Sequence, residues 1–409
     1  MYDLHLTPEQ LEIRDTVRDF VTRAVKPLAL EPARLEARER PLLVEALHQA
    51  SRMGLRTLAL PEELGGAGAD NLTCCIVTEE LAAGDPDVAA VLAQTATLAH
   101  ALFARRMTPA QHERFLPAFL SDDRYHLALA EHEPNRDATI GIDYHRPRTG
   151  DARFKTAAAR ADDAWVVSGV KERVANAPLA KLFAVEVSLS LERGKEGSGT
   201  ILVPRDTPGL SVHESGERWR HGSRGDVTFT DCRVPAENLL GAAEAGPDPG
   251  RAVPQEAALD LGIGRAAYEA ALDYAQLRVQ GGRRLIEHQA IGTKLAEIAI
   301  RLEVARDAIW QAAWASDHPD AFLDRSLSDL PLTSIAKVFA SDAIYRAAKD
   351  AAECFGAMGV MRDMPLCKYV HDALICLNSG IGNGEAKLRI AETLAGYRRP
   401  SPAAVLAAE

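Results

Sequence analysis

Aromatic side chains and positive charges are both scarce in this chain of 409 residues. Aromatics make up 5% of it, and 47 Lys and Arg against 58 Asp and Glu give a formal net charge of −11. A nucleic-acid surface needs a basic patch, so this charge argues against one. An anionic small molecule needs only a few local cations. The arginine-rich runs 278–284 and 218–224 could supply them, although a solvated surface explains either run equally well.

Cysteine and long apolar runs are also in short supply. The six cysteines are scattered and show no zinc-type spacing, so we expect reduced, mostly packed thiols and no metal site. No uncharged stretch reaches the length that spans a bilayer, and the N-terminus does not resemble a signal peptide. Together these absences predict a cytoplasmic location.

Helical signals dominate residues 1–125, which we predict to form an N-terminal helical domain. Thr7 is a suitable cap, Pro8 suits the first helical position, and Gln10 can complete a capping box. Two further helices are predicted over Leu72–Ala83 and Val88–Phe103.

The pattern changes to short strands and turns over residues 126–241, the predicted middle β-domain. Its strands are expected at Trp165–Val167, Leu182–Val187, Thr200–Val203 and Asp226–Phe229. Residues 242–409 then return to long helices, predicted over Glu256–Gln280, Gln289–Ser316, Ser334–Phe355 and Glu385–Tyr397. Gly241–Gln255 is rich in Gly, Ala and Pro and indicates a loop. The order of elements alone favours an α+β architecture with a β insertion between helical parts.

The stretch Gly356–Ala391 resembles the C-terminal region of the acyl-CoA dehydrogenase family without a gap. Other segments resemble the family in order and at plausible spacings: Pro61–Gly66, Thr207–Gly209, Asp231–Gly241, Leu261–Arg265, Tyr274–Arg278 and Leu285–Gln289. The resemblance implies a helical domain, a β-domain and a four-helix bundle, with FAD bound between the subunits of a homotetramer. It also implies an acyl-CoA or related thioester as substrate.

The family's usual catalytic base is absent. Counting forward from Asp372, the position where relatives carry a glutamate falls on Gly380. Some relatives place the base at the start of the long helix instead, which corresponds to Ala252 here. Glu256 lies one helical turn further and is a candidate displaced base. The alternative is a glutamate that merely suits a helix N-terminus.

The flavin-facing residues of the family are also replaced. His132 stands where relatives have threonine, and Arg173 stands where they have an aromatic that packs on the flavin ring. With Glu131 and Glu133, these two could form a replacement catalytic set, because histidine titrates near neutral pH. Alternatively His132 is an exposed loop residue and Arg173 pairs with a nearby glutamate. About a dozen extra residues follow Pro134.

The resemblance assigns further cofactor contacts near the neighbouring subunit. Those expected contacts are Glu133, Arg278, Gln280, Gly282, Glu353, Gly356 and Gly359. Glu353 replaces a glutamine and Gly382 replaces a threonine, and both changes weaken contact with a diphosphate. FAD is the expected cofactor, and these changes leave weakened or lost binding as an alternative.

Three functions remain open at this point. The first is an atypical FAD-dependent oxidoreductase of this family acting on an acyl thioester. The second is a non-catalytic subunit that lacks the base and pairs with a related chain. The third is a flavin-free, non-redox enzyme that reuses the same cleft.

Overall fold

The first part of the chain is helical. The computed structural model describes residues 5–35, 40–134, 154–190, 196–215, 220–240, 249–318, 330–380 and 382–396. Its N-terminal helices are α1 (Pro8–Phe20), α2 (Lys26–Ala29), α3 (Val44–Arg52), α4 (Asn71–Ala82), α5 (Pro86–Ala99) and α6 (Pro109–Ser121). The predicted capping box begins α1: Thr7 Oγ1 accepts from the Gln10 N–H, and the Gln10 side chain accepts from the Thr7 N–H.

Helix α5 continues through a π-helical turn, His100–Ala104. The combined stretch Pro86–Ala104 is long and apolar enough to cross a membrane by length and composition, although it contains Asp87 and is not uncharged. Most of it is buried, and α5 packs on α4, α7 and strand β1. It therefore has the properties of a core helix.

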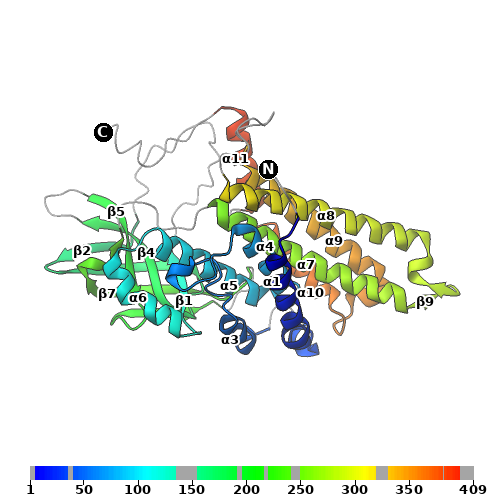
Figure 1. Ribbon diagram of the computed structural model, residues 1–409, viewed down its shortest axis with the longest axis horizontal. Helices are drawn as coiled ribbons and strands as arrows, with labels where there is room; N and C mark the ends of the chain where they lie inside the picture. Colours follow the sequence, from blue (N-terminus) through cyan, green and yellow to red (C-terminus); the bar gives the residue numbers. More distant parts are fainter. Residues whose placement is uncertain are drawn as a thin grey trace.

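The middle of the chain forms one sheet, on the left in Figure 1. Its strands are β1 (His126–Ala130), β2 (Ala157–Ala161), β3 (Ala164–Ala175), β4 (Ala180–Ser190), β5 (Glu196–Pro204), β6 (Leu210–Glu214), β7 (Arg224–Pro235) and β8 (Leu239–Leu240). The order is β6-β7-β3-β2-β4-β5-β8, and β1 pairs in parallel with β4. All four predicted strands lie within these elements, in β3, β4, β5 and β7, but β1, β2, β6 and β8 were not predicted.

The last part is a bundle of long helices that extends to the right in Figure 1. It contains α7 (Pro249–Leu277), α8 (Gln289–Asp317), α9 (Leu332–Cys354), α10 (Leu366–Cys376) and α11 (Gly382–Leu394), with a hairpin of β9 (Val279–Gln280) and β10 (Arg283–Arg284). The sequence analysis missed α10. It also assigned 249–255 to a loop, whereas these residues form the first two turns of α7.

The early start of α7 has a local explanation. Pro254 cannot donate a backbone hydrogen bond to the carbonyl of Gly250. The side-chain amide of Asn71 on α4 donates to that carbonyl instead, at 3.4 Å. Packing against α4 thus compensates for a residue that reads as a breaker in the sequence.

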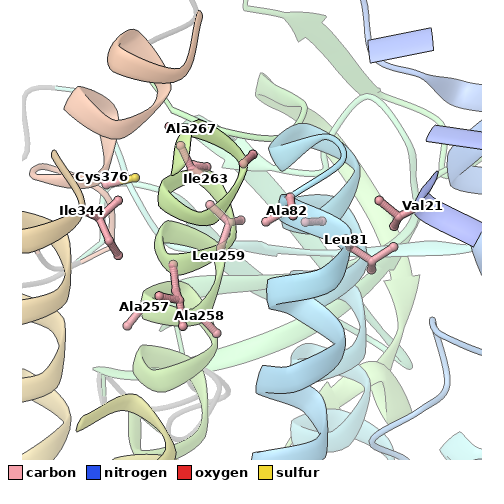
Figure 2. Packing of buried hydrophobic residues seen from close by; sticks show 14 of the residues in the cluster. Val21, Leu81, Ala82, Ala257, Ala258, Leu259, Ile263, Ala267, Ile344 and Cys376 are labelled. Atoms are coloured by element: carbon pink, nitrogen blue, oxygen red, sulfur yellow. The ribbon is translucent and has the colours of Figure 1, made fainter. Parts of the chain in front are cut away.

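Helix α7 lies at the centre of the main core. Figure 2 shows its side chains, including Leu259 and Ile263, between α4 and α9. A Cβ on Gly262 would lie 2.4 Å from the Glu79 carbonyl oxygen. The close approach of α4 and α7 therefore requires glycine at this point.

A buried ionic network joins the three parts of the fold. Arg40 donates to Asp372 at 2.6 and 3.1 Å and to Asp87 at 3.1 Å. Lys368 donates to Asp372 at 2.9 Å, and a ring nitrogen of His221 lies 3.2 Å from the Asp372 carbonyl oxygen. Burial opposes the ionisation of Asp372, but the neighbouring cations outweigh it and hold its pKa well below the usual range. Because all five residues are buried, the network fixes the α5, β-sheet and α10 regions relative to one another.

Candidate active site

The carboxylate of Glu256 lies where a side chain on residue 380 would begin. A Cβ built on Gly380 would be 1.8 Å from Glu256 Oε2 and 2.7 Å from its Cδ. Gly380 also has φ +57°, a left-handed conformation that favours glycine. The two positions therefore exclude one another: the carboxylate reaches this place only because residue 380 has no side chain.

Lys337 on α9 stabilises the segments that carry Glu256 and Gly380. Its buried ammonium donates to Asp260 Oδ2 at 2.8 Å, to the Cys376 carbonyl at 2.7 Å and to Ser379 Oγ at 3.1 Å. These bonds tie α9 to α7 and to the turn that carries Gly380. Glu256 and Asp260 are four residues apart on α7, so they lie on the same helix face.

The surroundings of Glu256 raise its pKa. Burial has the largest effect, and Asp260 raises the pKa further. Lys337, Arg220 and Arg224 act in the opposite direction but do not cancel the rise. A carboxylate whose pKa is raised is a stronger base than an ordinary glutamate.

Two arginines lie beside this carboxylate. Arg220 Nη1 is 3.4 Å from the Gly380 carbonyl oxygen, and Arg224 Nη1 donates to the Arg173 carbonyl at 3.2 Å. Burial and the neighbouring Arg220 lower the pKa of Arg224 to about 10, although Glu256 opposes the shift. We call Arg173, Arg220 and Arg224 the arginine cluster.

The backbone that carries these arginines is anchored. The Gly222 N–H donates to Asp87 Oδ1 at 3.0 Å, and His221 contacts the Asp372 carbonyl. Strand β7 continues the anchoring, because Arg224 pairs with Ala175 of β3. The arginine cluster is thus attached to the same buried network that joins the three parts of the fold.

His132 and Arg173 lie close to this site. The His132 side chain is 63% exposed, and its Nε2 is 3.3 Å from Glu131 Oε1. Partial burial and the cations of Arg173, Arg220 and Arg224 lower its pKa, against the effect of Glu131. His132 is therefore mostly neutral at neutral pH. Arg173 is exposed and has φ +55°. Its backbone N–H donates a hydrogen bond to Asp226 Oδ1.

Glu133 does not belong to this group, which corrects the sequence expectation. Its carboxylate is buried and accepts from Lys171 Nζ at 2.9 Å and from the N–H groups of Lys155 and Thr156. Burial opposes ionisation, but these hydrogen bonds outweigh it and lower the pKa of Glu133. The reason is topological: the end of β1 faces the β2–β3 hairpin, so Glu133 holds the sheet together and is not available to a ligand. The extra residues predicted after Pro134 lie outside the described ranges.

The other predicted cofactor contacts lie at the far end of the bundle. Arg278 and Gln280 are exposed at the β9–β10 hairpin, whose Gly281 and Gly282 both have positive φ as a two-residue turn requires. Glu353 forms an ion pair with Lys294, so its negative charge is compensated. The expectation that Glu353 weakens contact with a diphosphate stays a prediction.

Gly356 and Gly359 have structural explanations as well. Gly356 follows the end of α9 with φ +56°. A Cβ on Gly359 would lie 2.3 Å from the Ala352 carbonyl oxygen, so close packing accounts for this glycine.

The candidate residues thus form two separate groups. Glu256 and Arg278 are 22 positions apart, mostly along α7, which corresponds to about 30 Å at 1.5 Å per residue. One chain cannot bring both groups to the same small ligand. The exposed Arg278 and the compensated Glu353 fit an anionic diphosphate, and the arginine cluster fits an anionic ligand at the other end. The residues present are therefore compatible with FAD held between two copies of the chain.

Sequence reasoning overlooked Lys337 and Asp260, since both fall inside long helical patterns without a motif. Across the described ranges, no group of three or more His, Cys, Asp or Glu side chains is placed to hold a metal ion. A surface groove of about 550 Å³ lies between α1 and residues 53–67, away from every candidate residue.

Comparisons with known proteins agree with this geometry. Residues 7–123 match the model of the acyl-CoA dehydrogenase N-terminal domain, and residues 254–393 match that of the C-terminal domain. The chain is 30% identical over 373 residues to the short-chain specific acyl-CoA dehydrogenase of Rattus norvegicus, covering 89% of this chain and 84% of the relative. It is also 30% identical to an acyl-CoA dehydrogenase of Bacillus subtilis, covering 91% and 94%.

Solved structures of this family also resemble the fold of this chain. The butyryl-CoA dehydrogenase of Megasphaera elsdenii superimposes with a TM-score of 0.80 at 26% identity, covering 96% of this chain and all of that one. The predicted helix–sheet–helix fold is confirmed, and this chain belongs to the acyl-CoA dehydrogenase family.

Proposed function

We propose that this protein is an FAD-dependent acyl-CoA dehydrogenase in which Glu256 removes the α-proton of the substrate. The observation that supports this most directly is the overlap between the Glu256 carboxylate and the place of a residue-380 side chain. The relatives named short-chain specific acyl-CoA dehydrogenase and butyryl-CoA dehydrogenase support a thioester substrate. A cytoplasmic location and a homo-oligomer complete the proposal.

The proposed reaction converts a saturated acyl thioester into its α,β-unsaturated product. Glu256 accepts the proton from the α-carbon, the electron pair of that C–H bond forms the new double bond, and a hydride leaves the β-carbon. Bound FAD would supply the oxidant of the reaction, as the acceptor of this hydride. The raised pKa of Glu256 suits the step, because α-protons are weakly acidic and need a strong base.

Lys337 has a positioning role in this proposal. It does not reach the substrate; it fixes Asp260 and the Cys376–Ser379 turn on which Gly380 depends. Asp260 in turn raises the pKa of Glu256. The buried pair therefore maintains both the space for the carboxylate and its basicity.

Flavin content and α-proton exchange test the proposal together. The purified protein should show flavin absorption, and a short-chain acyl-CoA in D₂O should exchange its α-hydrogen. Glu256→Gln should lower exchange by about 10²- to 10⁴-fold, the usual contribution of a general base, while flavin content stays the same. His132→Gln is the matched control and should retain exchange.

Two results would contradict the proposal. Exchange that persists in Glu256→Gln would exclude this residue as the base. A protein that neither carries nor takes up FAD would instead favour the base-less subunit or the flavin-free enzyme.

A further inference from the structure

We propose that the site selects acyl thioesters whose acyl group carries a second, anionic end such as a carboxylate, bound by Arg220 and Arg224. This inference rests on the proposed function, because it assigns the substrate class of the same site. It concerns the acyl portion alone, since every CoA thioester carries the same phosphates.

Arg220 lies beside the candidate base, and Arg224 lines the same small pocket as Arg220. In the proposed reaction the α-carbon must lie within hydrogen-bond reach of Glu256. Arg220 contacts the carbonyl of Gly380, whose Cα faces the Glu256 carboxylate. Arg224 interacts electrostatically with Glu256 and with Arg220. A carboxylate a few carbons from the thioester would therefore reach these cations.

Charged groups of both signs surround the site. The arginine cluster supplies three positive charges, and His132 is mostly neutral. Glu256 and Glu131 both act on Arg224, and Glu214 lines the same small pocket as Arg220 and Arg224. Glu256 takes up the substrate proton in the proposed reaction, so its charge disappears during turnover. An anionic acyl group would replace the negative charge that Glu256 loses beside Arg224.

The arginines are held in place rather than free to turn away. Arg224 is only partly exposed, and its Nε is buried without a hydrogen-bond partner in the described structure. Its segment is anchored through Gly222 to Asp87 and through His221 to Asp372. An unsatisfied donor on a fixed cation favours an anionic partner, because a charge-assisted hydrogen bond would satisfy both the donor and the charge.

Binding of chain-matched thioesters tests the inference. The two pairs are succinyl-CoA with butyryl-CoA and glutaryl-CoA with valeryl-CoA. Their dissociation constants would be measured by calorimetry on the flavin-loaded protein under anaerobic conditions. All measurements use the Glu256→Gln background, which prevents turnover. The acidic member of each pair should bind about 10-fold or more tightly, as expected for one charge-assisted contact. Adding Arg224→Met should reduce that ratio to about one.

The matched control is Arg233→Met. Arg233 is on the same strand, but its side chain is 55% exposed and pairs with Asp163 outside the site. This variant should keep the preference for acidic thioesters. Flavin content is measured in all variants, because an Arg224→Met protein that loses flavin but keeps the preference would assign Arg224 to the cofactor.

The outcomes separate this inference from the proposed function. Equal or tighter binding of the neutral thioesters, or a preference that survives Arg224→Met, would overturn the inference while Glu256-dependent exchange could still stand. A clear acidic preference together with exchange that does not need Glu256 would overturn only the proposed base. If neither thioester of a pair binds, both are wrong.

Discussion

At the scale of single residues, the Glu256 carboxylate and a side chain at position 380 exclude one another. The carboxylate occupies the place where a Cβ on residue 380 would lie, so adding a side chain there would displace it. A side chain at position 380 and the observed place of the Glu256 carboxylate are thus incompatible. In the proposed function the base therefore lies on helix α7 instead of on the turn that carries Gly380.

This complementarity predicts that the base can be moved back. Glu256→Gly combined with Gly380→Glu should recover about 10-fold or more of the α-proton exchange lost in Glu256→Gly alone, as part of the contribution of a general base. Recovery should be incomplete, because a non-glycine residue at φ +57° costs about 1 kcal/mol or more.

Gly380→Glu alone is the control. It would force two carboxylates into one space and should lower the thermal stability of the protein. An exchange rate in the double variant no higher than in Glu256→Gly would show that position 380 no longer faces the substrate.

The raised pKa of Glu256 predicts how activity depends on pH. The base must be ionised, so kcat/KM should fall as the pH drops through its pKa. Because burial and Asp260 raise this pKa, the fall should occur at higher pH than for an ordinary glutamate. The pH dependence of kcat/KM, determined from a thioester concentration series at each pH, measures this fall.

The pKa of His132 is lowered by burial and the nearby arginines, so its titration shifts toward that of a carboxylate with a raised pKa. His132→Gln should therefore leave the acidic limb of the profile in place. If the limb disappears in that variant, His132 and not Glu256 is the group that titrates.

At the scale of elements, α7 is decisive because it carries the proposed base, Glu256, and packs on both α4 and α9. Its contact with α4 depends on Gly262, where a Cβ would meet both the Glu79 carbonyl and Ala82. The helix therefore accepts no side chain at this point, although alanine is the better helix former.

Two glycine-to-alanine substitutions should have opposite effects. Gly262→Ala should destabilise the protein by about 1–3 kcal/mol through overpacking. A Cβ on Gly292 in α8 would meet only the Ile286 carbonyl oxygen, at 3.5 Å. Gly292→Ala should therefore stabilise the protein by about 0.5–1 kcal/mol through helix propensity. Urea unfolding midpoints measure both. Equal shifts in the same direction would contradict the close α4–α7 contact.

At the scale of the whole molecule, the buried network of Arg40, Asp87, His221, Lys368 and Asp372 joins the three parts. It also anchors the arginine cluster. Fold stability and site geometry are therefore coupled through the same side chains.

Removing Arg40 tests this coupling. Arg40→Met leaves Asp372 and Asp87 buried with fewer cations and should cost about 3–5 kcal/mol. Arg346→Met removes an exposed pair, with side chains 65% and 53% exposed, and should cost about 0–1 kcal/mol. A midpoint shift for Arg40→Met no larger than that of Arg346→Met would show that the network contributes little.

The sequence by itself determined the family, the order of helices and sheet, and the absence of a carboxylate at Gly380. Those features follow from local patterns and motif spacing, which one chain carries along its length. Only the tertiary structure decided that Glu256 takes over this place, that Glu133 holds the sheet, and that Arg220 and Arg224 face the same site. These outcomes depend on where distant segments meet, and no local pattern contains that information.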